Sequence, residues 1–179
     1  MSELVERARV FATKAHEGQT RLGRDKLPLV THCEEVVSLV RESGGSDEEL
    51  AAAWLHDVIE DTPVLFTEII EKFGHNVAFI VFGLTDPPDF KDLPVLERKT
   101  AQAERVRLLS DSVKRVKVAD QTSNVRSIST DPPVKWDTQK RIDYIEGARK
   151  IVFECWNVNE FLSRKFCEAY WAAIEAYNK

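Results

Sequence analysis

The sequence predicts an all-α domain, on three observations. Apolar residues recur every three or four positions in almost every segment, which is the spacing of one helix face. The stretches between these runs are short and rich in Gly, Pro, Asp and Ser. Seven Gly and seven Pro leave little room for the many tight turns of a β-sandwich. With 179 residues, the chain is expected to form a single domain, residues 1–179, with a sizeable core.

The first half of the chain is expected to contain five helices, in this order: residues 5–15, 31–44, 46–61, 65–73 and 76–84. Thr31 and Ser46 are each followed three positions later by Glu, which predicts a capping box at the start of the second and third helices. Thr62 and Pro63 end the third helix, because the residue before proline avoids helical backbone angles. Residues 17–29 are polar and punctuated by Gly, and are predicted to be a loop.

The second half is expected to contain four more helices: residues 95–109, 113–127, 136–153 and about 155–178. They are separated by the turn-rich residues 86–89, 110–111 and 131–133. The final helix is amphipathic and carries several large aromatic side chains: Trp156, Phe161, Phe166, Tyr170 and Trp171. We expect this helix to pack on the domain core. A dimer surface is the open alternative, so a homo-oligomer remains possible.

Composition excludes several function classes. A net charge of −5 is unfavourable for a general nucleic-acid binder, so an anionic substrate would need a local basic pocket. The three Cys have neither CxxC nor zinc-finger spacing, which is typical of free thiols in a reducing cytosol. Residues 1–9 lack the apolar run of a signal peptide, and the longest apolar run, residues 77–84, is too short to cross a bilayer. The sequence therefore predicts a cytoplasmic protein without a membrane segment.

The chemically richest segment is residues 56–61, which places four polar side chains at the end of an apolar helical run. On a helix, residues four apart lie one turn above each other. Glu60 is therefore expected to stack over His56, and Asp61 over Asp57. This layout predicts a pair of metal ligands below and an acid–base pair above.

Two further side chains complete a possible metal site. His32 at the start of the second helix and Asp120 in the helix at 113–127 add one imidazole and one carboxylate to His56 and Asp57. A mixed N/O set suits Mn, Fe, Co or Zn better than Ca. Glu60 and Asp61, one turn further along, are better placed to hold or deprotonate a water.

Each of these residues has a plainer interpretation when taken alone. A single His–Asp pair is more often structural or on the surface than a metal site, and the two acids could be solvated. Asp120 could pair with a neighbouring Lys117 or Arg126. The argument for a site rests on all of them occurring together.

Six motifs along the chain carry a family resemblance. Residues 12–21 are similar to A-x-x-A-H-x-G-Q-x-R, residues 28–32 to P-Y-I-x-H, and residues 52–62 to A-A-L-L-H-D-V-V-E-D-T. Residues 84–86 match V-T-D, residues 96–99 match L-E-R-K, and residues 116–124 are similar to V-K-L-A-D-K-x-x-N. With these motifs the chain resembles the HD-domain phosphohydrolases, and more narrowly the RelA/SpoT-type alarmone hydrolases and their stand-alone versions, including metazoan SpoT homologues.

The resemblance implies an HD-domain helical bundle whose metal-site core spans about residues 5–153. It implies Mn²⁺-dependent removal of the 3′-pyrophosphate from guanosine tetra- or pentaphosphate, a small nucleotide. The implied residues are His32, His56, Asp57 and Asp120 as metal ligands, Glu60 and Asp61 for water activation, and Arg21, Asn124, Lys140 and Tyr144 for substrate binding. Arg141 is the alternative to Lys140, because the register there is open by one residue.

Three positions depart from the family pattern. Leu22 replaces a basic residue, Leu29 replaces an aromatic one, and Gln121 replaces a Lys. In the family these positions shape the base pocket and phosphate contacts, so the nucleotide is left open. The alternatives are an adenine alarmone or another 3′-phosphorylated nucleotide as substrate, or a nucleotide-binding module without turnover.

Overall fold

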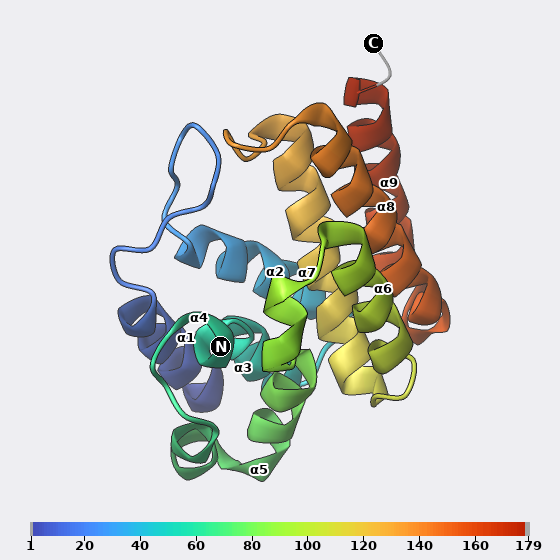
Figure 1. Ribbon diagram of the computed structural model, residues 1–179. Helices are drawn as coiled ribbons and strands as arrows, with labels where there is room; N and C mark the ends of the chain where they lie inside the picture. Colours follow the sequence, from blue (N-terminus) through green and yellow to red (C-terminus); the bar gives the residue numbers. More distant parts are fainter. Residues whose placement is uncertain (1, 178–179) are drawn as a thin grey trace.

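The computed structural model describes residues 2–177, and its named elements in that range are all helical (Figure 1). The α-helices are α1 (Glu3–Ala15), α2 (Val30–Glu42), α3 (Asp47–Leu55), α4 (Val58–Asp61), α5 (Phe66–Leu84), α6 (Val95–Val106), α7 (Asp111–Thr130), α8 (Thr138–Glu154) and α9 (Glu160–Tyr177). Two short 3₁₀ helices, η1 (Pro88–Asp92) and η2 (Trp156–Val158), lie between them. The all-α prediction is confirmed.

Helix α7 is the central element. It packs against α2, α3 and α5 on one side and against α8 and α9 on the other (Figure 1). The Ser110 side chain caps its start by accepting from the amide of Val113, and Pro132 follows its end. Its middle turns are buried although they contain the polar residues Asp120, Gln121, Thr122 and Ser123. Buried polar side chains need partners, so the elements around α7 must supply them.

Two predictions about helix starts had different outcomes. The capping box at Ser46 is confirmed, since the Ser46 hydroxyl accepts from the Glu49 amide and Glu49 accepts from the Ser46 amide. The capping box at Thr31 is wrong. Helix α2 already begins at Val30, and the Thr31 hydroxyl donates to the Pro28 carbonyl instead. The reason is that the preceding loop folds back on itself, with the Leu29 amide donating to the Gln19 carbonyl.

The prediction of one continuous helix from Ser46 to about Asp61 is also wrong. Helix α3 ends at Leu55, a turn follows at His56 and Asp57, and α4 is a separate helix of one turn. Asp61 still donates its amide to the Asp57 carbonyl at 2.9 Å, so this part of the stacking survives. Asp57 itself has backbone angles of φ −96° and ψ −6°, which interrupt the helix. This turn sets the direction of the His56 and Asp57 side chains.

The remaining elements follow the sequence pattern closely. The predicted break between two short helices is confirmed as a kink at Gly74, whose φ of +82° favours glycine. Helix α9 buries Leu162, Phe166 and Ala173 against the core, which confirms the packing prediction for this face. It begins at Glu160 rather than near residue 155, and position 178 lies outside the described residues. No helix in the described range is both long and apolar enough to span a membrane.

Helices α6 and α8 approach closely at Gly147. A Cβ at this position would lie 2.5 Å from the Cβ of Lys99 and 2.6 Å from its Cγ. Glycine inside a helix is unfavourable by about 1 kcal/mol relative to alanine, so Gly147→Ala would normally stabilise the protein. Overpacking a core contact costs about 1–3 kcal/mol, and here this cost is expected to be the larger.

We therefore expect Gly147→Ala to lower the free energy of unfolding by about 1 kcal/mol or more in urea titrations. Phe153→Ala, on the exposed face of the same helix, is the control and should change it by less than about 0.5 kcal/mol. A Gly147→Ala protein as stable as the wild type would contradict this account of the α6–α8 contact.

Candidate active site

Four side chains from three parts of the fold converge on one point. His32 lies in the first turn of α2, His56 and Asp57 lie at the turn between α3 and α4, and Asp120 lies in the middle of α7. The Nε2 atoms of His32 and His56 are 3.1 Å apart. An Asp57 oxygen lies 3.2 Å from His56 Nε2, and an Asp120 oxygen lies 3.4 Å from His32 Nε2. Tertiary packing thus brings together all four predicted ligands.

Neighbouring groups fix which nitrogen of His32 faces this point. The Ser123 hydroxyl donates to the carboxylate of Glu35 at 2.6 Å, and Arg126 holds that carboxylate from the other side at 2.9 Å. A hydroxyl whose proton is already donated can only accept, so the contact of 2.8 Å with His32 Nδ1 requires an N–H on Nδ1. In neutral His32, Nε2 therefore carries a lone pair.

The same reasoning applies to His56. Its Nδ1 lies 2.8 Å from the backbone carbonyl of Ala53, which can only accept, so Nδ1 carries the proton and Nε2 the lone pair. Two lone pairs facing each other at 3.1 Å repel unless a cation lies between or beside them. With the Asp57 carboxylate, these two nitrogens form a group of ligand atoms within 4.8 Å of one another, which fits a divalent transition metal; an Asp120 oxygen lies 3.4 Å from His32 Nε2 and 3.9 Å from His56 Nε2.

The pKa shifts agree with this geometry. Burial alone would lower the pKa of His56, but the nearby charges of Asp57 and Asp120 raise it to about 9. Burial lowers the pKa of His32, and the charge on His56 adds to that effect. Burial opposes ionisation of Asp57, yet its contact with His56 lowers its pKa to about 2. In the metal-free protein, a raised pKa of about 9 favours a proton on His56 at neutral pH, with Asp57 and His32 both within reach of its Nε2.

Asp120 is held by several donors. One of its oxygens accepts from Gln121 Nε2 at 2.8 Å and from Lys117 Nζ at 3.3 Å. The other accepts from Asn124 Nδ2 at 2.6 Å and is the oxygen that faces His32. The positive charge of Lys117 and the contact with His32 outweigh burial and keep the pKa of Asp120 well below its usual range. Asp120 therefore presents an ionised oxygen in a fixed direction.

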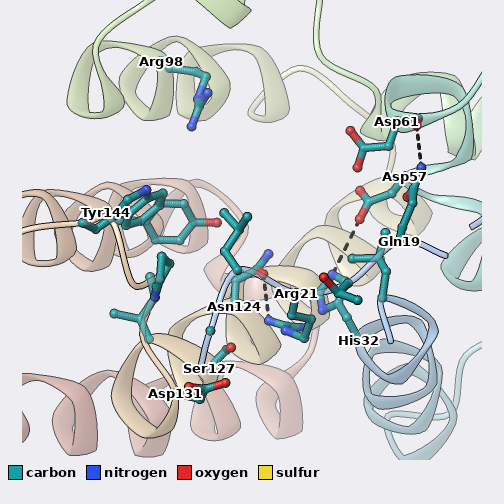
Figure 2. A pocket seen from close by; sticks show the side chains of 17 residues that line it. Gln19, Arg21, His32, Asp57, Asp61, Arg98, Asn124, Ser127, Asp131 and Tyr144 are labelled. Atoms are coloured by element: carbon teal, nitrogen blue, oxygen red, sulfur yellow. Dashed lines mark hydrogen bonds and ion pairs between the residues drawn. The ribbon is translucent and has the colours of Figure 1, made fainter. Parts of the chain in front are cut away.

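Glu60 and Asp61 do not form a symmetrical pair. Asp61 is exposed and lines the cavity beside Asp57, and its backbone carbonyl accepts from Gln19 Nε2 at 2.9 Å (Figure 2). The Glu60 carboxylate turns away and accepts from the Asp86 amide at 3.1 Å. Burial raises the pKa of both carboxyl groups, and the charge of Asp57 adds to the shift of Asp61. Both groups are thus made more basic than ordinary carboxylates.

A cavity of about 590 Å³ opens beside the four converging side chains. Arg21 and Arg98 lie on opposite sides of it, from the loop before α2 and from α6 respectively (Figure 2). Arg21 Nη2 donates to Asn124 Oδ1 at 3.4 Å. The rings of Trp136 and Tyr144, 5.4 Å apart, form another part of the wall. The cavity thus has Arg21 near His32 and Asn124, and Arg98 across from it on the side of the aromatic rings (Figure 2).

The predicted substrate-binding residues are distributed unevenly. Arg21, Asn124 and Tyr144 line the cavity. Lys140 is exposed, with its Nζ 5.0 Å from the Trp136 ring, and is absent from the cavity lining, so its role stays a prediction. Arg141, the alternative, donates to the carbonyl of Pro133 at 3.2 Å.

The three departures from the family pattern separate in the structure. Leu22 and Leu29 line the cavity, whereas Gln121 is buried behind Asp120 and does not reach it. Sequence reasoning missed Arg98 and Gln19 as cavity residues, although both lie inside motifs that it singled out. Their positions in those motifs were the available signal, but only the fold brings them to the site.

A helical domain with a two-His, two-Asp centre beside such a cavity defines a class. The family model described as the HD domain matches residues 8–145 of this chain. The chain belongs to the HD-domain family.

Three proteins show what this chain is similar to. The guanosine-3′,5′-bis(diphosphate) 3′-pyrophosphohydrolase MESH1 of Xenopus tropicalis is 35% identical over 164 residues, which cover 90% of each chain. The bifunctional (p)ppGpp synthase/hydrolase SpoT of Escherichia coli K12 is 36% identical over 143 residues, 75% of this chain and 19% of that protein. A solved structure of a metazoan SpoT ortholog, described as hydrolysing ppGpp, superimposes with a TM-score of 0.87 at 29% identity and covers 96% of each chain.

The proton held on His56 leads to a prediction about metal affinity. A metal that took both Nε2 lone pairs as ligands would have to displace this proton. Since the pKa of His56 is raised to about 9, the proton competes throughout the neutral range. The apparent affinity for Mn²⁺ should therefore rise about tenfold per pH unit between pH 6 and 8. Calorimetric titrations in buffers of different ionisation enthalpy should show release of about one proton per metal. An affinity that is constant over this range would contradict the arrangement.

Proposed function

We propose that this protein is a metal-dependent hydrolase that removes the 3′-pyrophosphate from guanosine tetra- or pentaphosphate and releases pyrophosphate. The observation that carries the proposal is the pair of imidazole lone pairs, 3.1 Å apart, beside a cavity with an Arg on either side. The names of the MESH1 and SpoT relatives support the substrate. We also propose that its partner is a small nucleotide substrate and that it acts in the cytoplasm.

In this proposal His32, His56, Asp57 and Asp120 hold the metal, for which Mn²⁺ is the best candidate. A bound divalent metal lowers the pKa of a water and polarises a phosphate oxygen. The protein contributes by orienting its ligands, through Ser123 and Glu35 for His32 and through the Ala53 carbonyl for His56. These contacts leave the lone pairs pointing at one place before any metal arrives.

Asp61 and Glu60 are proposed to prepare the attacking water. Asp61 lies at the cavity wall beside Asp57, so its carboxylate can accept a proton from a water placed there. Its raised pKa makes it a better base than an ordinary aspartate. Glu60 accepts from the Asp86 amide and does not line the cavity, so its proposed share in holding the water requires its carboxylate to turn toward Asp61 when substrate is bound. The pyrophosphate leaves when the water oxygen bonds to phosphorus and the bond to the 3′-oxygen breaks.

Charge and shape of the cavity suit a nucleotide with a phosphorylated ribose. Arg21 and Arg98 supply positive charge on opposite sides, which would place a pyrophosphate between them. Asn124, which contacts both Arg21 and Asp120, would connect the phosphate region to the metal region. Trp136 and Tyr144 offer ring faces against which a base or ribose can pack.

One observation favours a second class of substrate. Leu22 and Leu29 place apolar side chains at the cavity, where the family pattern has a basic and an aromatic residue. An adenine alarmone carries the same phosphates as its guanine counterpart, so for it the change would act on recognition of the base. Another 3′-phosphorylated nucleotide with fewer phosphates would suit the less charged cavity. Competition between guanosine and adenosine tetraphosphate for turnover decides between them, because the ratio of kcat/KM values measures the preference directly.

The metal and acid roles can be separated by mutation. Purified protein with Mn²⁺ and guanosine tetraphosphate should release pyrophosphate. Asp57→Ala should abolish both metal binding and turnover, because it removes a ligand. Glu60→Gln and Asp61→Asn should bind metal as tightly as the wild type but lose about 10²–10⁴-fold in kcat. The proposed water activation would be wrong if both acid variants kept the wild-type rate, and release of orthophosphate alone would contradict the reaction.

Arg98 gives an independent test of substrate binding. Hydrogen bonds to charged groups contribute about 1.5–3 kcal/mol, so Arg98→Met should lower kcat/KM for guanosine tetraphosphate roughly 10- to 100-fold. Arg107→Met, on an exposed position at the end of the same helix, is the matched control and should leave kcat/KM unchanged. Equal effects of the two variants would show that Arg98 has no specific contact with substrate.

A further inference from the structure

A buried lysine lies between the metal region and the substrate cavity. Lys99 on α6 is 3% exposed, and its stem packs against Gly147 of α8, where no larger residue fits. Its Nζ donates to Gln121 Oε1 at 2.7 Å and lies 4.0 Å from the centre of the Tyr144 ring. Gln121 contacts Asp120, and Tyr144 lines the cavity. The nitrogen of one side chain thus touches one residue of each region.

The contact with Gln121 determines which way its amide points. Because Lys99 donates to Oε1, the NH₂ group of the amide is directed to Asp120, to which it donates at 2.8 Å. The opposite amide orientation would place NH₂ against the lysine nitrogen and the amide oxygen against the carboxylate, so both contacts would be lost. The donor from Gln121 occupies one Asp120 oxygen and leaves the other facing His32.

The contact with Tyr144 acts on the cavity wall. In its protonated form, Lys99 is a cation over the face of the Tyr144 ring, and such a contact contributes about 0.5–2 kcal/mol, depending on how far it is desolvated. With a pKa of about 7, about half of the molecules carry this charge at neutral pH. Here Lys99 is buried and Tyr144 is half-buried, and the Tyr144 ring also packs on Trp136. Loss of the lysine would let this wall residue change its rotamer.

Stability alone does not account for Lys99. Burial lowers its pKa to about 7, so the charged form is less favourable in the folded protein than in the unfolded chain. The ionisation of Lys99 therefore lowers the free energy of unfolding at neutral pH. This loss disappears only as the pH rises through the pKa of a lysine in the unfolded chain, about 10.4. Burial of Lys99 therefore lowers the stability of the fold, while its nitrogen contacts Gln121 and Tyr144. We expect its role to lie in orienting these two residues.

We propose that Lys99 is a positioning residue that orients the metal ligand Asp120 through Gln121 and holds Tyr144 in the cavity wall. The inference rests on the proposed function, because Asp120 is a proposed ligand and the substrate is a proposed substrate; metal binding can be measured without turnover, so the two arms can fail separately. Gln121 is one contact removed from the metal, and partners at that distance typically change metal affinity 10- to 100-fold when they are lost. Lys99 acts through Gln121, so its loss is expected to fall at the low end of that range.

The test compares three variants of the full chain at fixed pH. Free Mn²⁺ measured by electron paramagnetic resonance gives the metal dissociation constant, and turnover of guanosine tetraphosphate at saturating Mn²⁺ gives KM. Lys99→Met should raise the dissociation constant roughly tenfold and KM roughly fivefold. Gln121→Met should raise only the dissociation constant, because it does not contact Tyr144. Lys150→Met, whose lysine reaches Thr100 across the same α6–α8 contact, should change neither.

The double variant Lys99→Met/Gln121→Met tests whether the two residues act on metal affinity through their shared hydrogen bond or by separate losses of structure. It also leaves neither partner of that hydrogen bond unsatisfied. If the two residues act through one hydrogen bond, its metal dissociation constant should equal that of Gln121→Met, and its KM should equal that of Lys99→Met. If Lys99→Met does not fold alone, the metal dissociation constants of the double variant and of Gln121→Met are compared instead. Equal constants support the proposal, and a weaker double variant contradicts it.

Additive effects on metal affinity would overturn the proposal. It would also be overturned by a lower melting temperature of metal-free Lys99→Met with unchanged dissociation constant and KM. If the wild type does not hydrolyse guanosine tetraphosphate, the proposed function fails, and the Mn²⁺ measurements still test the Asp120 arm.

Discussion

The structure depends on one constraint, the fixed direction of two imidazole lone pairs. Ser123 and the Ala53 carbonyl each hold an Nδ1–H, and so they force the Nε2 atoms of His32 and His56 to face each other at 3.1 Å. This arrangement is repulsive without a cation, whether a proton or a metal. The surrounding carboxylates supply the charge that makes a cation favourable there.

Helix α7 makes that constraint possible by burying a polar stripe at the centre of the domain. Asp120 and Ser123 lie on it, and each needs partners from other helices. Ser123 connects to Glu35 on α2, and Asp120 connects through Gln121 to Lys99 on α6. The polar network therefore ties together the helices that form the site, and its cost in desolvation is offset only because nearly every member has a partner.

Much of this site could be predicted from the sequence, for identifiable reasons. The ligand types and the acid pair lie in short motifs, and the helices have clear periodicity and breaks. The wrong predictions arose where contacts with residues distant in the sequence determine the local structure. Thr31 does not cap because a loop returns to Pro28, and the helix at Ser46 breaks at His56 although its pattern continues. Gln121 replaces a Lys at a position expected to shape the base pocket or phosphate contacts, yet its side chain is buried and contacts Asp120 and Lys99 instead.

The sequence by itself determined the helical class, the order of the elements and the chemical types available to the site, because periodicity and residue identity are local properties. Tertiary structure decided which nitrogen of each histidine faces the centre, which acid lines the cavity and which lysine contacts both Gln121 and Tyr144. These depend on contacts between residues such as Lys99 and Gln121, or His32 and Ser123, that are far apart in the chain. Hydrogen-bond direction is set by the partner present in space, and the sequence alone does not specify that partner.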